Sequence, residues 1–382
     1  MTLTSPITPD ELDHLREQLP ATQSVAYLNA GSFGPLPQVA LDAMLEQDTY
    51  DAEFRQDVDH WDRLQQLQIG ARDAISELTG VTRDQVALMH TTHEALNACL
   101  WGLDLQSGES IITTDEEHPG LLVPLRHMRH RRGTEVRTIA WSDDDTELVD
   151  RIVAAADERT RAVTLSHVSW KSGRTAPLRM IRDALPDPVR LIVDGAQSGG
   201  VFAVDPTDGW DAYSVSGQKW PCGPSGSGGL ALRDPESWLP TYGAYMQVTD
   251  FTDILASPLE PTARRLEMSQ EALSPLAGLA ASVRWIVTEV GLQRVFAHAR
   301  ACNARARELL EAGGVDLTTL HGSAHLLAVD LPGADRIATE LYADGYLIRS
   351  LTTERLRLSF GFWNTAAEVE GCIEALLARA RA

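Results

Sequence analysis

From residue 86 onward, short apolar runs alternate with longer stretches in which apolar residues recur at helical spacing. The apolar runs predict seven strands, at 86–89, 110–113, 135–140, 161–168, 189–193, 212–215 and 229–232. The stretches between the first five runs predict helices at 93–103, 120–131, 145–156 and 178–185. Strands separated by helices are typical of βαβ units, so we expect an α/β fold with a mostly parallel sheet. In such a sheet, ligands bind beyond the carboxyl ends of the strands.

The N-terminal part of the chain lacks this alternation. Apolar spacing there predicts three helices, at 9–18, 37–55 and 61–79. Between the first two, residues 31–35 contain two glycines and a proline, which predict a loop at the end of an extended segment.

After residue 232 the pattern changes again. Residues 235–268 contain four prolines and predict a loop-rich segment, whereas 275–314 predict an amphipathic helical stretch broken near Gly291. Residues 315–382 predict two or three strands and two helices. We therefore expect a large domain and a small α+β domain, at 20–268 and at 1–19 combined with 269–382.

Composition narrows the class of protein. A chain of 382 residues is long enough for two or three domains. Its formal net charge of −21 argues against nucleic acid and anionic membranes as partners. No apolar run reaches the ~18 residues that suggest a membrane span, and the polar, acidic start predicts no signal peptide. We expect a cytoplasmic protein.

The cysteines add a second constraint. Four are scattered along the chain without any CxxC pair, namely Cys99, Cys222, Cys302 and Cys372. This spacing predicts free thiols in a reducing compartment and no zinc site or other metal site.

Lysine usage points to one position. Of the 33 basic residues only two are lysines, Lys171 and Lys219, so arginine serves almost everywhere that a plain cation suffices. Unlike arginine, lysine can lose its proton and attack a carbonyl carbon to form a Schiff base. Lys219 follows the predicted strand 212–215, at the edge of the sheet where a ligand would bind. We therefore predict that Lys219 is a reactive amine.

Three other polar groups follow predicted strands. Thr92 and His93 stand at a helix start, where backbone N–H groups suit a phosphate. His118 follows the next strand and could stack on a planar ring, and Asp194 could keep a ring nitrogen protonated. Taken singly, each has an ordinary interpretation as a helix cap, a loop histidine or a turn aspartate. Together with Lys219 they are the parts needed to hold pyridoxal phosphate.

At this point the chain resembles the class V aminotransferases, in the cysteine desulfurase-like branch of fold-type I pyridoxal phosphate enzymes. The resemblance covers 27–370 and rests on motifs at 194–198, 216–220, 223–226, 357–359 and 363–365. It implies a large domain with a mostly parallel seven-stranded sheet between helices, and a small α+β C-terminal domain.

The resemblance also implies roles around the cofactor. Lys219 would hold pyridoxal phosphate covalently and move the Cα proton of the substrate. Asp194 would pair with the pyridine nitrogen, Gln197 would bind the ring hydroxyl and His118 would stack on the ring. The residues implied to contact the phosphate are Thr92, His93, Ser216 and Gln218.

Substrate and partner contacts are implied as well. Arg357 would clamp the carboxylate of an amino-acid substrate in a bidentate fork. Asn29 and Ala30 match the N-terminal loop that approaches the substrate in this family. The family's sites are shared within a homodimer, and Ser269 and Gln270 match the segment that reaches the partner's phosphate.

The chain departs from the desulfurase pattern in three places. Gln218 stands where many members have histidine, and it can still donate to a phosphate. Trp170 stands where desulfurases have an asparagine near the ring hydroxyl, which places a bulky wall at this cofactor contact. Residues 345–353 match the loop that carries the catalytic cysteine of desulfurases, yet they contain none. The nucleophile for direct attack on the sulfur is therefore missing.

The remaining chemistry needs only the cofactor and Lys219. We expect a carbon–sulfur lyase that cleaves cysteine, cystine or a cysteine S-conjugate by β-elimination to pyruvate, ammonia and a thiol or persulfide. The segments 166–173 and 219–224 resemble the cyst(e)ine C–S lyases more than the desulfurases. Cys222 is interpreted as structural, and Lys171 as either a substrate or phosphate contact or a surface residue.

Other functions stay open at this point. An isopenicillin N epimerase-like racemase, an aminotransferase, or a decarboxylating or oxidising enzyme of secondary metabolism would use the same cofactor. A cofactor-binding domain without catalysis is a further alternative. We expect the substrate side chain to meet loops 30–35, 240–248 and 349–355, partly from the other subunit, with Tyr242 and Tyr245 as candidates.

Overall fold

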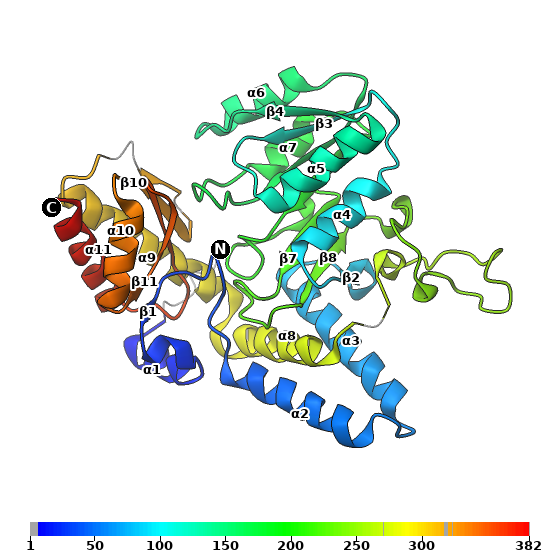
Figure 1. Ribbon diagram of the computed structural model, residues 1–382, viewed down its shortest axis with the longest axis horizontal. Helices are drawn as coiled ribbons and strands as arrows, with labels where there is room; N and C mark the ends of the chain where they lie inside the picture. The colour runs from blue at the N-terminus through cyan, green and yellow to red at the C-terminus, as the bar shows by residue number, and fades with distance from the viewer. Residues whose placement is uncertain (1–6, 270, 317–319, 323, 382) are drawn as a thin grey trace.

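The computed structural model describes residues 7–269, 271–316, 320–322 and 324–381. A larger lobe is built on a seven-stranded sheet, and a smaller lobe contains the C-terminal helices and a four-stranded sheet (Figure 1). The prediction of an α/β fold with a seven-stranded sheet is confirmed. The predicted domain boundary at residue 268 stays a prediction.

The large sheet is mostly parallel. Its order is β2-β8-β7-β6-β5-β3-β4, and only β8 runs antiparallel to its neighbours. In the order of the chain the strands are β2 (Val86–Leu88), β3 (Ser110–Thr114), β4 (Glu135–Ile139), β5 (Thr160–Ser166), β6 (Arg190–Asp194), β7 (Ala212–Ser216) and β8 (Gly228–Leu232).

Both faces of this sheet are buried except along the edge strand β4, whose residues are exposed or half-buried, and this burial explains the apolar character of the inner strands. In β6, Leu191 and Val193 belong to the apolar cluster on one face, and Ile192 belongs to the cluster on the other. Parallel strands need long crossovers. Those between successive strands contain α4 (Thr92–Gly102), α5 (Pro119–Arg132), α6 (Asp145–Ala155) and α7 (Leu178–Ala184).

The remaining helices lie near the two ends of the sequence. The N-terminal ones are α1 (Pro9–Glu17), α2 (Gln38–Phe54) and α3 (His60–Thr79). The later ones are α8 (Leu273–Trp285), α9 (Leu292–Ala312), α10 (Ala334–Ala343) and α11 (Ala366–Ala380). The predicted break near Gly291 is confirmed, because this residue has a positive φ of 86° and separates a π-helical turn from α9. Helix α8 packs on α2 and α3 (Figure 1).

The small lobe has more strands than the sequence predicted. Its sheet has the order β12-β13-β10-β9, and a separate parallel pair joins β1 (Ala26–Tyr27) to β11 (Tyr346–Leu347). The sheet strands are β9 (Leu320–His321), β10 (Leu326–Asp330), β12 (Arg349–Thr352) and β13 (Arg355–Ser359). The prediction of two or three strands after residue 315 was wrong, because two-residue strands are too short to produce an alternating pattern.

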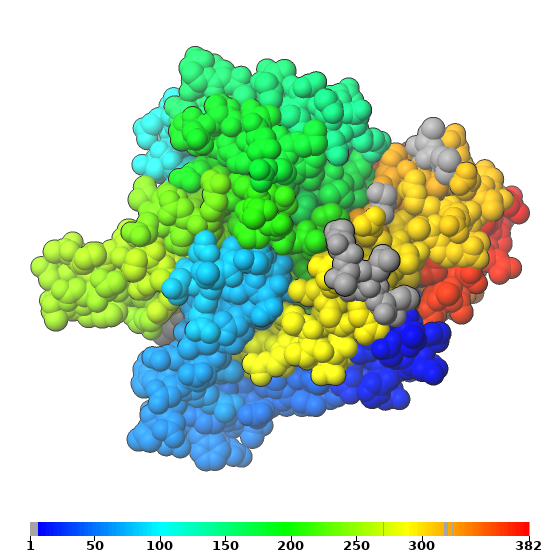
Figure 2. Space-filling view, turned by 180° about the vertical axis from the view of Figure 1, so that it is seen from behind, coloured from blue at the N-terminus to red at the C-terminus, as the bar shows by residue number. Residues whose placement is uncertain are grey.

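The loop-rich segment between β8 and α8 protrudes from the larger lobe (Figures 1 and 2). At its base, Thr249 N donates to Pro258 O at 3.1 Å, and a β-bridge joins Val248 to Leu259. No helix within the described ranges combines the length and the apolar composition needed to cross a bilayer.

Candidate active site

Polar residues follow five strands of the large sheet at their carboxyl ends. Thr92 follows β2, His118 follows β3, Trp170 follows β5, Asp194 ends β6 and Lys219 follows β7. All five line one cavity of about 210 Å³. The strands that carry them run in the same direction, so their carboxyl ends meet at one edge of the sheet.

Most of the residues predicted for the site line this cavity. The predicted residues in its lining are Thr92, His93, His118, Trp170, Asp194, Gln197, Ser216, Gln218, Lys219 and Arg357. Asn29 and Ala30 do not line it, and Ala30 is fully buried in an apolar cluster. Ser269 lies outside the lining, and Gln270 lies outside the described residues. The roles assigned to these residues stay predictions.

The N-terminal loop reaches the cavity within the range 30–35 that was expected to form a wall. Gly31, Ser32 and Phe33 line the cavity, whereas Asn29 and Ala30 do not. The chain at Asn29 still pairs with Ser359 at the end of β13 through a β-bridge. The glycine-rich composition of 31–35 was the signal for a close approach, but it does not say which residue faces a ligand.

Sequence reasoning assigned no individual role to five further lining residues, most of which lie within the segments 166–173, 194–198 and 349–355. They are Thr91, Ser166, Val168, Ala196 and Arg349. Arg349 is an exposed residue on β12, within the range 349–355 that was expected to form a wall. Conversely, Lys171 lines none of the cavities described here.

Two tyrosines expected at the substrate wall lie elsewhere. The hydroxyl of Tyr242 donates to Glu94 Oε1 at 3.3 Å, on α4. Tyr245 lines a separate groove of about 1060 Å³ beside α2, α3 and the start of α8. Neither tyrosine lines the cavity, and their predicted place in a substrate wall formed partly by the other subunit stays a prediction.

Lys219 supplies the amino group that lines the cavity, and the pKa of this group is lowered. Burial lowers the pKa of Lys219 to about 8, Asp194 opposes this shift, and the positive charges of Arg357 and Arg349 add to it. A desolvated amine beside other cations is neutral at a lower pH than an ordinary lysine, and a neutral amine is a nucleophile and a base.

Asp194 keeps one carboxylate oxygen for a ligand. Its side chain is buried, and Oδ1 accepts hydrogen bonds from Ala196 N at 2.9 Å and Ser214 Oγ at 3.4 Å. Because both bonds fall on Oδ1, Oδ2 is left to accept from a protonated ring nitrogen in the cavity.

Arg357 is a buried guanidinium without an acidic partner. It is 1% exposed on β13; Nη1 donates to Trp170 O at 3.0 Å and Nη2 to Ser32 Oγ at 3.3 Å. Its Nε has no partner, and no carboxylate of the described chain forms an ion pair with it. Burial lowers the pKa of Arg357 to about 9, with help from Arg349. A desolvated, unpaired guanidinium is suited to a ligand carboxylate.

Arg349 stands beside this guanidinium. Its Nη1 donates to Ser32 Oγ at 2.8 Å, so one hydroxyl accepts from both arginines. The side chain is exposed rather than buried, which places this second cation at the mouth of the cavity.

The two cavity histidines are stacked. The rings of His93 and His118 lie 5.7 Å apart at 16°, and Trp170 meets His118 edge-on at 5.0 Å. Nδ1 of His118 accepts from Gly120 N at 3.0 Å, so the proton of the neutral ring is on Nε2. Burial lowers the pKa of His118 to about 4. The imidazole ring of His118 is therefore uncharged and planar, which suits it to stacking on an aromatic ring.

The start of α4 provides an anion site. The side chain of Thr91 accepts from Glu94 N at 3.1 Å, and its carbonyl accepts from Ala95 N. Among the described residues, the N–H groups of Thr92 and His93 have no acceptor, and both residues line the cavity. Free N–H groups and the helix dipole together favour a phosphate.

Gln197 is already occupied by protein groups. Nε2 donates to Gly31 O at 2.8 Å, and Oε1 accepts from Trp220 Nε1 at 3.1 Å. The amide therefore anchors the N-terminal loop over the cavity. The predicted hydrogen bond between Gln197 and the hydroxyl group of the cofactor ring would use the second proton on Nε2 or the second lone pair on Oε1.

The cysteines are structural in this fold. All four are buried, and burial raises the pKa of Cys302 and of Cys372 to about 12, so these thiols stay protonated. None of them lines the cavity.

Comparisons with known proteins agree with this geometry. Residues 26–371 match the family model described as aminotransferase class-V. The chain is 28% identical to a cysteine desulfurase of Haloferax volcanii over 290 residues, which is 72% of this chain and 67% of that protein. A structure of the cystine C–S lyase C-DES, in complex with its product cysteine persulfide, superposes with a TM-score of 0.86 at 25% identity. It covers 94% of this chain and 99% of the lyase. A mutant of the same lyase has been solved with glycine covalently linked to its PLP cofactor, with a TM-score of 0.85 at 25% identity.

Gly31 is predicted to be essential for the arginine site. A Cβ at this position would lie 2.7 Å from Arg357 Nη2 and 2.9 Å from Ser359 Oγ. We expect Gly31→Ala to displace the guanidinium and to raise the Kd of an amino-acid ligand by about 10–100-fold, with cofactor uptake retained. Absorbance titration of the loaded protein would measure this Kd. Gly243→Ala, where nothing lies within 4 Å, is the control. Unchanged amino-acid binding in Gly31→Ala would contradict the assignment.

The lowered pKa of Lys219 predicts a pH dependence. Below about pH 8 the amine is protonated and cannot attack an aldehyde, so the uptake rate of pyridoxal phosphate should rise with pH and level off above about 8. With a lysine of ordinary pKa, the uptake rate would continue to rise up to about pH 10.4. Initial rates of absorbance increase in cofactor-free protein test this. A rate still climbing between about pH 9 and 10 would show that the amine is not desolvated.

Proposed function

Because the chain belongs to the aminotransferase class-V family, we propose that it is a pyridoxal phosphate-dependent carbon–sulfur lyase. Its substrate would be cysteine, cystine or a cysteine S-conjugate, cleaved by β-elimination to pyruvate, ammonia and a thiol or persulfide. The observation that carries the proposal is the arrangement of Lys219, Asp194 and the unpaired Arg357 around one cavity with no cysteine in its lining.

The residues present suit the cofactor. The amine of Lys219 suits its aldehyde, the free oxygen of Asp194 suits its ring nitrogen, and the start of α4 suits its phosphate. When bound, pyridoxal phosphate supplies the electron sink that makes the Cα proton of a linked amino acid acidic.

The protein's own groups perform the remaining tasks. Arg357 binds the α-carboxylate and fixes the orientation of the amino acid, so that the Cα–H bond faces Lys219. The neutral amine of Lys219 then takes the Cα proton as general base. Breaking of the Cβ–S bond sends its electron pair to the sulfur, which takes up a proton and leaves as a thiol or persulfide, or as hydrogen sulfide where cysteine is the substrate. Hydrolysis of the three-carbon fragment releases pyruvate and ammonia.

The missing cysteine favours elimination over desulfuration. A desulfurase that takes the substrate sulfur onto its own cysteine needs a thiolate that can reach that sulfur. Residues 345–353 contain no cysteine, and the four cysteines of the chain are buried away from the cavity. The similarity to a protein described as a cystine C–S lyase supports the same reaction class.

Activity assays can test the reaction directly. Loaded protein should form pyruvate and ammonia in equal amounts from at least one member of a panel of cysteine, cystine and cysteine S-conjugates. Lys219→Ala should lower the rate by at least about 10²–10⁴-fold, because it removes the base. Lys171→Ala, which changes the other lysine, should keep the wild-type rate.

The alternative functions give different products. Conversion of the cofactor to its amine form without pyruvate would indicate an aminotransferase. Exchange of the Cα proton with loss of chirality would indicate a racemase, and carbon dioxide release would indicate a decarboxylase. Any of these without pyruvate would overturn the lyase proposal.

A homodimer with a shared site is the second part of the proposal. The protruding segment 248–259 exposes Phe251, Ile254 and Leu255, and Leu255 is fully exposed. The groove of about 1060 Å³ is lined in part by the exposed Trp61 and Tyr245. Exposed apolar clusters of this kind mark interaction sites, and we propose that a second copy covers them. Ser269 and Gln270 would then face the partner's phosphate site.

Light scattering after size-exclusion chromatography tests this assembly. Leu255→Asp should shift the protein from dimer to monomer, because the new carboxylate would be buried without a partner. Val153→Asp on α6 replaces another exposed apolar residue outside the protruding segment and should leave the dimer intact. A wild-type monomer, or a Leu255→Asp dimer of unchanged affinity, would refute the proposed interface.

A further inference from the structure

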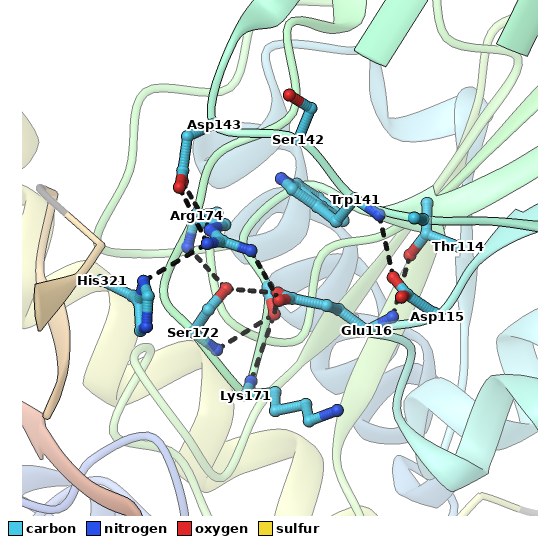
Figure 3. A network of polar contacts seen from close by, with 12 residues as sticks. Thr114, Asp115, Glu116, Trp141, Ser142, Asp143, Lys171, Ser172, Arg174 and His321 are labelled. Atoms are coloured by element: carbon cyan, nitrogen blue, oxygen red, sulfur yellow. Dashed lines mark hydrogen bonds and ion pairs between the residues drawn. The ribbon is translucent and has the colours of Figure 1, made fainter. Parts of the chain in front are cut away.

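Glu116 is a buried carboxylate just outside the cavity. It follows the carboxyl end of β3, two residues before His118, and it is 8% exposed. Its Oε2 accepts from Ser169 Oγ at 2.7 Å. The same oxygen accepts from Ser172 Oγ, and Oε1 accepts from Arg174 Nη1 at 2.9 Å (Figure 3). One carboxylate thus receives three donors from a single loop, residues 169–174.

The loop held by Glu116 is tightly closed. Ser169 N donates to Arg174 O, and Gly173 N donates to Ser169 O, both at 2.8 Å. The N–H groups of Lys171 and Ser172 both donate to Ser169 Oγ at 3.2 Å. The same hydroxyl donates to Glu116, so the carboxylate fixes the one group that holds both backbone N–H groups of the loop.

Trp170 lies in this loop and touches two groups of the active site. Its carbonyl accepts from Arg357 Nη1 at 3.0 Å, and its ring meets His118 edge-on at 5.0 Å. The carbonyl is one of only two acceptors that the described residues offer to the guanidinium of Arg357. A shift of the loop would therefore move an acceptor that orients this arginine.

A second route connects the same network to β13. Arg174 Nη2 donates to His321 Nδ1 at 3.3 Å (Figure 3). His321 Nε2 lies 3.1 Å from Asp330 Oδ2. Asp330 in turn accepts from Arg355 Nη2 at 2.6 Å, two residues before Arg357 on the same strand. Glu116 and Arg174 thus link the large sheet to the guanidinium of Arg357, through Trp170, and to the strand that carries it, through Arg355.

We propose that Glu116 is a positioning residue for substrate binding, which acts through the loop 169–174 to set the Trp170 carbonyl and the guanidinium of Arg357. The proposal rests on the proposed function, because it takes Arg357 as the site of the substrate carboxylate. Glu116 itself does not line the cavity, so it acts on the affinity for the amino acid and leaves the proton transfer at Lys219 unchanged.

The chain offers a matched pair of substitutions. Asp143 is a second carboxylate partner of Arg174, with Oδ2 2.8 Å from Nη2, but it accepts from neither Ser169 nor Ser172. Glu116→Gln and Asp143→Asn therefore each remove one negative charge from the same guanidinium, and only the first disturbs the loop. Ser172→Ala is a milder loop variant that leaves no buried charge unpaired.

The experiment uses protein loaded with pyridoxal phosphate and the substrate found in the panel. We expect Glu116→Gln to raise KM, and the Kd of the amino acid from absorbance titration, by about 10-fold, with kcat within about threefold of wild type. The visible absorbance of the bound cofactor should not change. Ser172→Ala should raise KM by about threefold, and Asp143→Asn should stay within twofold of wild type.

Three outcomes would overturn the role of Glu116. The first is a KM that is unchanged in both Glu116→Gln and Ser172→Ala. The second is a rise in the KM of Asp143→Asn as large as that of Glu116→Gln. The third is a fall in the kcat of Glu116→Gln with no change in its KM. If Glu116→Gln does not fold, Ser172→Ala decides by the same measurements. A wild-type protein that binds amino acids without forming pyruvate would refute the proposed reaction alone, because the Kd comparison still tests Glu116. A wild-type protein that binds no amino acid would refute both.

Discussion

The site depends on the electrostatic interaction of two buried cationic side chains, Lys219 and Arg357, with a single carboxylate, that of Asp194. Lys219 and Arg357 are both desolvated in the cavity, and Asp194 supplies the one carboxylate in its described lining. The two cations repel each other, and the Coulomb effect of Arg357 contributes to the lowered pKa of Lys219. The free cavity thus favours anionic ligands, and a ligand that carries a phosphate and a carboxylate would neutralise it.

Lys219 and Arg357 are held close together although they repel each other, because each is fixed by a different lobe. The large sheet delivers Asp194 and Lys219 from adjacent parallel strands, whose backbones are fixed by hydrogen bonds along their length. Arg357 comes from β13 in the small lobe, and the loop 31–34 passes between the two. Gly34 N donates to Gln218 O at 2.9 Å, so this loop is tied to the chain just before the reactive lysine.

The same architecture explains how a desulfurase-like protein can serve a different reaction. The absence of a loop cysteine does not alter the positions of Lys219, Asp194 and Arg357, because these residues lie on strands or just after them. Trp170 adds a rigid aromatic wall against His118. The lining thus combines a desolvated amine, one carboxylate and a buried guanidinium with the exposed side chain of Arg349.

Local pattern was sufficient for the part of the molecule that consists of long, periodic elements. The seven strands and the helices between them were predicted close to their observed bounds, because burial of both sheet faces imposes continuous apolar runs. Lysine scarcity and strand-end placement singled out Lys219 for a chemical reason that needs no coordinates. The positions of Asp194 and His118 followed in the same way, since residues after parallel strands share one edge.

Only the tertiary structure decided the contacts between segments distant in sequence. The pairing of Ala26–Tyr27 with Tyr346–Leu347, and the placing of Gly31 rather than Asn29 against Arg357, join residues more than 300 positions apart. Arg349 and Glu116 carry no motif, and their importance comes from the hydroxyl and guanidinium groups that folding brings to them. Sequence periodicity determines which face of an element is buried; it contains no information on which distant side chain completes a hydrogen bond there.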